Sequence, residues 1–265
     1  MNAKADHGLK KLSSTTSLKR LTSKPTEPAA AADCALDEVQ RCTGRTGEIA
    51  MTRIQIIGAP FSSYVWVVRM ACEEKGVPYD LVPARMHSPE VLAIHPFGKI
   101  PVMRHDDITL CESKAIATYI DRTFAGPKLI PDDAREAAEV EQWVSLVNTA
   151  IDPCLIRTYI FGYLFPKGAD GKPDRAAIGA VLPAMQTQID VLDKAVARTG
   201  YLVGDSFSLA DIYLMPVLEV VERVPEGSEM VQSAKNLAAY FARHAGRPSY
   251  RASFPPPPPS VPRNG

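Results

Sequence analysis

The sequence predicts two folded domains, an α/β domain followed by an all-α domain. Short apolar and β-branched runs alternate with helical patterns from residue 51 to 126, whereas from 133 to 254 the apolar residues recur at helical spacing alone. The segment between them, Gly126 to Asp133, has the glycine, prolines and aspartates typical of a linker. A chain of 265 residues has room for two domains of this size.

The first elements of the α/β domain follow from its strand and turn signals. Arg53 to Gly58 is a β-branched run that we interpret as the central strand. A helix starts at Ser62-Ser63 and ends at Gly76, because glycine suits the left-handed position after a helix. Tyr79 to Pro83 is the second strand, and Ser88-Pro89-Glu90 opens a short helix with proline in its first turn.

A hairpin and a last helix complete this domain. The hairpin strands are Pro101 to Met103 and Ile108 to Cys111, joined by a turn at Asp106-Asp107. Glu112-Ser113 then opens a helix whose apolar residues recur at helical spacing up to Phe124. The resulting order, βαβ-α-ββα, is a thioredoxin-like layout in which the pieces that face a ligand converge at one end of the sheet.

Two features of the hairpin region indicate binding as well as scaffolding. Pro101 cannot donate to a β-ladder, so a strand that it opens lies at an edge or presents its backbone to another group. Ser113, at a helix start, combines a hydroxyl with unpaired backbone N–H groups, which suit a carboxylate. Each feature alone is more typical of an ordinary hairpin or helix cap.

Both features in this order resemble the glutathione-binding half of the thioredoxin-like domain of glutathione transferases. The chain reads H-P-F-G-K-I-P from His95 and E-S-K-A-I from Glu112, against N-P-F-G-Q-V-P and E-S-R-A-I in the phi class and its theta-like bacterial relatives. The resemblance implies a cis Ile100–Pro101 bond and pairing of the Ile100 backbone with the cysteinyl unit of glutathione. It also implies that Glu112 and Ser113 hold the γ-glutamyl amine and carboxylate.

Two basic residues are further candidates for glutathione binding. His87 falls where phi-class members often carry a lysine that contacts the glycyl carboxylate of glutathione. Lys99 replaces the glutamine of the family pattern and is long enough to reach a carboxylate. Taken alone, each is more typical of solvated surface.

Ser62 is the candidate catalytic residue. A thiol has an ordinary pKa of about 8.5, so glutathione needs help to become a thiolate at neutral pH. A hydroxyl at a helix N-terminus supplies a hydrogen bond and the positive end of the helix dipole. Ser62 lies four residues after Gly58, as the catalytic serine does in the phi-class pattern. Ser63 is the second choice, and Tyr64 comes later than the tyrosine of tyrosine-type transferases.

The same segment also resembles the zeta class of transferases, which isomerise maleylacetoacetate. The residues F-S-S-Y-V-W-V-V-R from Phe61 to Arg69 are similar to its S-S-C-x-W-R-V-R signature. Tyr64 replaces the cysteine of that signature and Val67 replaces its first arginine. We therefore interpret the chain as phi/theta-like, with isomerisation as an alternative activity.

The second domain is predicted to consist of helices. One runs from about Val140 to Ile151 and is expected to end at Pro153 or shortly after. Another is marked by apolar residues from Ile178 to Leu192. Ser208-Leu209-Ala210-Asp211 has the spacing of a capping box and occupies the place of S-L-A-D in glutathione transferases, so we assign it a folding role.

The resemblance implies a pocket for the second substrate, a small hydrophobic electrophile. This acceptor pocket is expected between Ser62 and the first long helix of the second domain. Its candidate walls are Phe61, Ile156, Tyr159 and Phe161, although aromatic residues at helical spacing are more typical of a core.

The two ends of the chain differ from its centre. Residues 1–50 are basic and rich in serine and threonine at first, then rich in proline and alanine. We interpret them as a disordered extension, although an organellar transit peptide has a similar composition. Residues 255–265 form a proline-rich tail, expected to be a stiff polyproline segment.

Composition limits the partners and the compartment. The formal net charge is zero, which argues against a nucleic-acid partner, and no apolar run approaches the roughly 20 residues of a membrane span. The five cysteines form no C-x-x-C pair and no metal-ligand spacing, so we expect no metal site and a reducing, cytoplasmic location.

The resemblance implies an enzyme of detoxification or stress response that uses glutathione as co-substrate and forms a homodimer. It would conjugate glutathione to an electrophile or use it to reduce one. The alternatives are a zeta-type isomerase and a non-catalytic interaction module, because this fold also serves in proteins that only bind partners.

Overall fold

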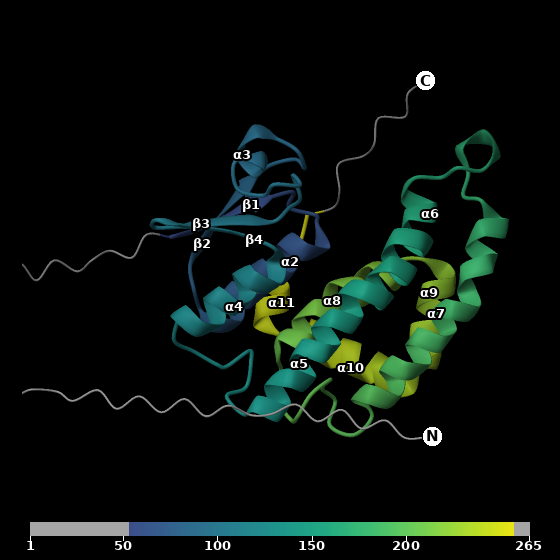
Figure 1. The fold of residues 1–265 in the computed structure, drawn as a ribbon. Coiled ribbons are helices and arrows are strands. Elements are labelled where there is room, and N and C mark those ends of the chain that lie inside the picture. The colour runs from purple at the N-terminus through teal and green to yellow at the C-terminus, as the bar shows by residue number, and fades with distance from the viewer. Residues whose placement is uncertain (1–52, 257–265) are drawn as a thin grey trace, which may run out of the picture. The chain divides into compact units, whose positions relative to one another are not determined.

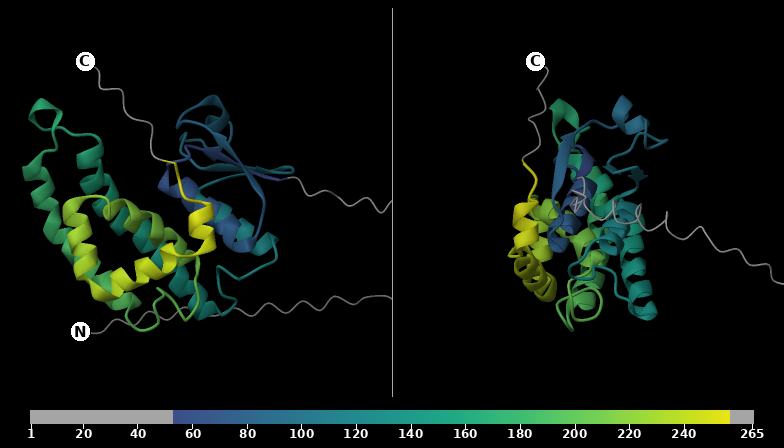
Figure 2. Two further views of the ribbon diagram at one scale, coloured as in Figure 1. Left: turned by 180° about the vertical axis from the view of Figure 1, so that it is seen from behind. Right: turned by 90° about the vertical axis from the view of Figure 1, so that its left-hand side faces the viewer.

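The computed structural model of the chain describes residues 53–256 (Figures 1 and 2). The extension 1–50 and all of the proline-rich tail beyond Pro256 lie outside the described residues, so the expectations for them stay predictions. Within the described range, an α/β part precedes a helical part. The predicted fold class, a thioredoxin-like α/β domain plus an all-α domain, is confirmed.

The α/β part contains four strands and three helices. In chain order they are β1 (Ile54–Gly58), α2 (Ser63–Lys75), β2 (Tyr79–Pro83), α3 (Pro89–Leu92), β3 (Val102–His105), β4 (Ile108–Cys111) and α4 (Ser113–Thr123). The strand order is β2-β1-β3-β4, with β1 parallel to β2 and antiparallel to β3. β1 is therefore an inner strand, as expected. β3 begins one residue later than predicted, because Pro101 has no N–H to pair.

The two faces of this sheet are covered by different helices (Figure 1). Ile54 and Ile56 of β1 pack with apolar residues of α2 and α4, among them Val65 and Ile116. Ile57 points to the opposite face, where it packs with Val91 of α3. This division follows from the alternation of side chains along a strand.

In the helical part, the first long helix continues further than the sequence predicted. The elements of this part are α5 (Ala134–Leu146), η1 (Val147–Ile160), α6 (Phe161–Leu164), η2 (Ala169–Gly171), α7 (Arg175–Val196), α8 (Leu209–Val221), α9 (Pro225–Ser233), α10 (Lys235–Ala245) and α11 (Pro248–Ala252). The helix predicted to end near Pro153 instead continues through it, because η1 is a π-helix. A proline within a helix is not confined to η1, because the α-helices α7 and α8 continue through Pro183 and Pro216.

α2 joins the two parts. Its residues Val65 and Val68 belong to the sheet core, whereas Trp66 and Met70 belong to the core of the helical part. The last helix, α11, packs against α2 (Figure 1), and the Trp66 indole donates to the Ser253 hydroxyl at 2.9 Å. The helix that begins beside Ser62 is thus held on both sides, which fixes the position of its first turn.

His244, on α10, predicts a pH dependence of stability. Its Nε2–H donates to the Gly200 carbonyl at 2.8 Å, and its buried Nδ1 has no partner among residues 53–256. Burial, and then the nearby Arg243 and Arg247, lowers its pKa from 6.5 to about 4. The unfolded chain therefore binds a proton below pH 6.5 that the folded chain takes up only near pH 4.

We expect the unfolding free energy to fall across this window by up to roughly 3 kcal/mol from His244 alone. Urea unfolding of the wild type and of His244→Phe, measured from neutral pH down to about pH 4, gives the difference in slope. Equal slopes for the two proteins would show that His244 titrates alike in both states.

Among residues 53–256, no helix is long and apolar enough to cross a membrane. No group of three or more histidine, cysteine, aspartate or glutamate side chains within this part of the chain is placed to hold a metal ion.

Candidate functional site

The register of the sheet brings the predicted glutathione-binding segments to one end. Ile57, near the end of β1, pairs with Val102 at the start of β3, and Val102 pairs with Cys111 at the end of β4. The turn to Ser62, the segment before β3 and the start of α4 therefore all leave the sheet at the same end. Segments that are distant in sequence meet here.

Ser62 stands at the start of α2 with its hydroxyl uncommitted. It has extended backbone angles, its carbonyl accepts the Trp66 N–H at 2.9 Å, and its side chain makes no capping hydrogen bond. The N–H groups of Ser63, Tyr64 and Val65 precede the first intrahelical bond. A partly exposed hydroxyl thus lies beside unpaired donors at the positive end of a helix.

The Ile100–Pro101 bond is cis and lies against this turn. A Cβ on Gly58 would come within 2.7 Å of Val65 Cγ2 and 3.2 Å of Ile100 Cβ, so only glycine lets the two segments approach this closely. Ile100 precedes β3 and takes no part in its ladder. Its backbone is available to a ligand in an extended conformation.

Glu112 and Ser113 occupy the start of α4 but face different surroundings. Glu112 has a positive φ of 69° and an exposed side chain. Ser113 is buried, and its hydroxyl lies 2.7 Å from the Tyr213 hydroxyl of α8 in the helical part. The first α4 N–H that bonds within the helix is that of Ile116, so the N–H groups before it have no backbone partner within residues 53–256.

The two predicted basic residues lie together beside Ile100. The His87 N–H donates to the Gly98 carbonyl at 2.8 Å, and a Cβ on Gly98 would meet the His87 ring at 2.6 Å. Lys99 follows directly, and the His87 and Lys99 side chains are both exposed. Two cation-forming groups therefore border the segment that precedes β3.

His95 was not among the predicted site residues, yet it holds Glu112. Its Nδ1 accepts the Phe97 N–H at 3.1 Å, so the ring proton must be on Nε2. Nε2 lies 3.2 Å from Glu112 Oε1 and donates to it. The buried imidazole thus uses one oxygen of the carboxylate and leaves the other free. No sequence signal marked this contact, because the family pattern has asparagine at this position.

Tyr213 was also missed. It is buried, and burial raises its pKa, so its hydroxyl stays protonated and can donate to Ser113 Oγ. If Tyr213 donates, the Ser113 proton is free for another acceptor, and such chains strengthen each bond. In sequence, Tyr213 lies one hundred residues away within the apolar run of α8, so spacing could not connect it with Ser113.

The candidate acceptor walls differ in exposure. Phe61 is 46 % exposed and Phe161 is partly exposed. Tyr159 has no exposed surface, and its hydroxyl donates to Glu226 at 3.0 Å, while Ile156 is buried in the helical core. A side chain without exposed surface cannot wall an open pocket, so Tyr159 is not retained, whereas Ile156, at 5 % exposed, stays a candidate with Phe61 and Phe161.

A charged pair on η1 lies beside the first turn of α2. Arg157 Nε donates to the buried Asp152 carboxylate at 2.8 Å, and the guanidinium carbon lies 5.9 Å from the centre of the Tyr64 ring. Burial and then the Asp152 charge raise the pKa of Tyr64 to about 12, although Arg157 opposes this. Tyr64 is therefore neutral at physiological pH and cannot serve as a base.

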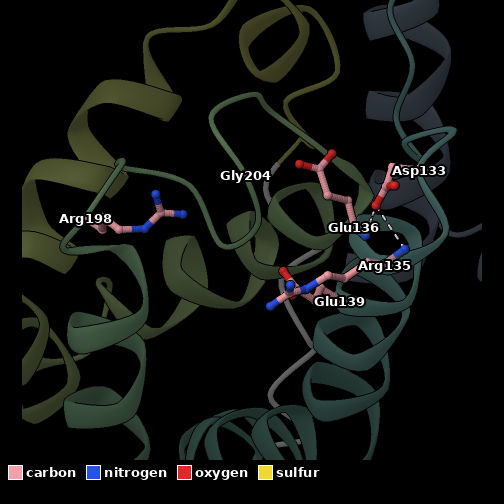
Figure 3. A pocket seen from close by; sticks show the side chains of 6 residues that line it. All are labelled: Asp133, Arg135, Glu136, Glu139, Arg198 and Gly204. Carbon is pink, nitrogen blue, oxygen red and sulfur yellow. Dashed lines mark hydrogen bonds and ion pairs between the residues drawn. The ribbon is translucent and has the colours of Figure 1, made fainter.

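A polar hollow elsewhere does not belong to this site. It is lined by Asp133, Arg135, Glu136, Glu139, Arg198 and Gly204 (Figure 3). These residues surround the amino end of α5, whereas η1 follows its carboxyl end. The thirteen residues of α5 span about 20 Å, which separates the hollow from Arg157.

Known proteins resemble the chain over both parts. Family models for the N-terminal and C-terminal domains of glutathione S-transferase match residues 56–128 and 153–248. Glutathione S-transferase 3 of Zea mays is 32 % identical over 223 residues, which cover 79 % of this chain and 99 % of that protein.

Solved structures give the same result. Glutathione transferase F7 of Populus trichocarpa matches with a TM-score of 0.69 and 28 % identity, covering 76 % of this chain and 97 % of that one. Glutathione S-transferase I from maize, in complex with an atrazine glutathione conjugate, matches with a TM-score of 0.69 and 26 % identity over 76 % and 96 % of the two chains. These three relatives are plant proteins rather than bacterial ones.

Proposed function

Because the chain belongs to the glutathione S-transferase family, we propose that Ser62 activates glutathione for attack on a small electrophile. The observation that carries this proposal is the sheet register, in which Ile57, Val102 and Cys111 bring three segments to one end. The Ser62 hydroxyl donates to the sulfur, and the unpaired N–H groups of α2 favour the thiolate over the thiol. Once formed, the thiolate attacks the electrophile and is converted into a thioether.

The remainder of glutathione extends away from Ser62. The Ile100 backbone pairs with the cysteinyl unit, which places the sulfur toward the start of α2. The free oxygen of Glu112 accepts the γ-glutamyl ammonium, and the Ser113 hydroxyl with the first N–H groups of α4 binds the adjacent carboxylate. His87 and Lys99 meet the glycyl carboxylate at the other end. His95 positions Glu112, and Tyr213 positions Ser113.

The finer assignments belong to this proposal as well. We assign the chain to a phi/theta-like class, with domains at 51–126 and 133–254, a homodimeric state, a cytoplasmic location and a role in detoxification or stress response. Light scattering at micromolar concentration tests the dimer, since a monomeric mass contradicts it.

Glu112→Gln tests whether this is a glutathione site. The substitution keeps the shape of the side chain but removes the charge that meets the ammonium group. A charged hydrogen bond contributes roughly 1.5–3 kcal/mol, so we expect the Kd for glutathione to rise about tenfold to more than a hundredfold in calorimetry. The turnover of bound glutathione should change less, because this charge lies at the far end of the tripeptide from sulfur.

Glu136→Gln provides a matched control, since it removes the same charge from the first turn of another helix, α5. Its glutathione affinity should equal that of the wild type. If Glu112→Gln also binds glutathione as the wild type does, Glu112 and Ser113 form only a helix cap. If the wild type binds glutathione but conjugates no electrophile in a broad panel, the chain is a binding module.

A further inference from the structure

The guanidinium of Arg157 is only partly engaged by the protein. Its Nε donates to Asp152 and the guanidinium also hydrogen-bonds the Tyr64 hydroxyl, but it makes no further hydrogen bond within residues 53–256. The side chain is 49 % exposed, while that of Asp152 is 6 % exposed. Asp152 and Tyr64 therefore hold the guanidinium from the protein side, and about half of the Arg157 side chain remains exposed to solvent.

Two aromatic rings flank this guanidinium. Its carbon lies 5.1 Å from the centre of the Phe161 ring and 5.9 Å from that of Tyr64. Tyr64 stands in the first turn of α2, two residues after Ser62, so the cation borders the turn that carries the proposed catalytic hydroxyl. A guanidinium held by an anion and two rings loses little further freedom when it binds a ligand.

We propose that Arg157 makes the acceptor site selective for electrophiles that carry a carboxylate. This inference rests on the proposed function and names the substrate class of the same site. Two Nη–H groups of one guanidinium edge match the two oxygens of a carboxylate, and the Phe161 and Tyr64 rings offer surface to a planar apolar body. The Asp152 charge offsets that of Arg157, so selection comes from direct hydrogen bonds rather than from a long-range field.

A matched pair of electrophiles tests this proposal, 4-chloro-3-nitrobenzoate and 4-chloro-3-nitrobenzamide. In both, the glutathione thiolate attacks the carbon that bears chlorine, the C–S bond forms, and chloride leaves with the electron pair of the C–Cl bond. The thiol proton passes to solvent. The two substrates differ in one group, a carboxylate or a neutral amide of similar shape, and each rate is divided by the uncatalysed rate with glutathione.

We expect the corrected kcat/KM for the carboxylate to exceed that for the amide by at least about tenfold. Arg157→Lys retains a partner for Asp152 but has no planar second edge, and Arg157→Gln removes the charge. In both variants the carboxylate-to-amide ratio should approach one. The ratio cancels any general change in activity, and circular dichroism with thermal unfolding verifies that both variants fold.

Calorimetry with the two glutathione conjugates makes the same comparison without turnover. The carboxylate conjugate should bind the wild type at least about tenfold more tightly than the amide conjugate, and both Arg157 variants should lose this preference. If the wild type binds both conjugates equally, or if the preference survives either substitution, the inference is overturned while the proposed function stands. If neither conjugate binds, both are overturned.

Discussion

Ser62→Ala is expected to lower kcat/KM for glutathione conjugation by roughly 100-fold, while the Kd for glutathione changes little. The hydroxyl makes no capping hydrogen bond, so its removal does not disturb the start of α2. What is lost is one donor to the thiolate. The pKa of the bound thiol should then move toward its ordinary value of about 8.5, and the pH profile of kcat/KM should shift to higher pH with it.

The neighbouring residues supply the controls for this result. Ser63→Ala removes a hydroxyl from the same turn, and Tyr64→Phe removes one whose pKa is already raised to about 12. Both variants should keep the wild-type pH profile. If either abolishes turnover while Ser62→Ala remains active, a different residue stabilises the thiolate.

Local signals in the sequence were sufficient to predict most of the fold. The strands Tyr79–Pro83 and Ile108–Cys111 and the glycine after α2 were predicted correctly, because alternation, turn residues and caps act over a few neighbours. The helix end predicted at Pro153 was wrong, because that prediction also relied only on neighbouring residues. A proline disfavours the interior of an α-helix, yet α7 and α8 continue through Pro183 and Pro216, and nothing in the neighbouring residues signals that the backbone widens into a π-helix at Pro153.

Some residues of the candidate site could likewise be predicted from local sequence motifs, and others could not. Ser62, the Ile100–Pro101 bond and Glu112-Ser113 lie in short contiguous motifs, so a single sequence was enough to select them. His95 and Tyr213 act through contacts with Glu112 and Ser113, and Arg157 lies against Tyr64. The last two contacts join α4 to α8 and α2 to η1, and they exist only because α2 packs into the helical core.

Asp211→Asn should cause a large loss of stability. The carboxylate is fully buried and accepts four hydrogen bonds, from the Leu202 N–H, the Ser208 N–H, the Ser208 hydroxyl and the Tyr240 hydroxyl. Asparagine replaces one acceptor oxygen with a donor, so one backbone N–H, that of Leu202 or of Ser208, loses its acceptor, and the hydroxyl on the same oxygen has to turn and accept from the amide instead. The buried unpaired N–H alone should lower the unfolding free energy by roughly 1–3 kcal/mol.

Asp133→Asn makes the same chemical change at an exposed helix start, and this comparison isolates the effect of burial. The Asp133 carboxylate accepts the N–H groups of Arg135 and Glu136 at 3.0 Å, and asparagine caps a helix about as well as aspartate. Urea unfolding should therefore show a loss below about 1 kcal/mol for this variant. If Asp211→Asn costs no more than Asp133→Asn, the buried carboxylate does not hold α8, α10 and the segment before α8 together, because its lost hydrogen bonds would then be replaced by others.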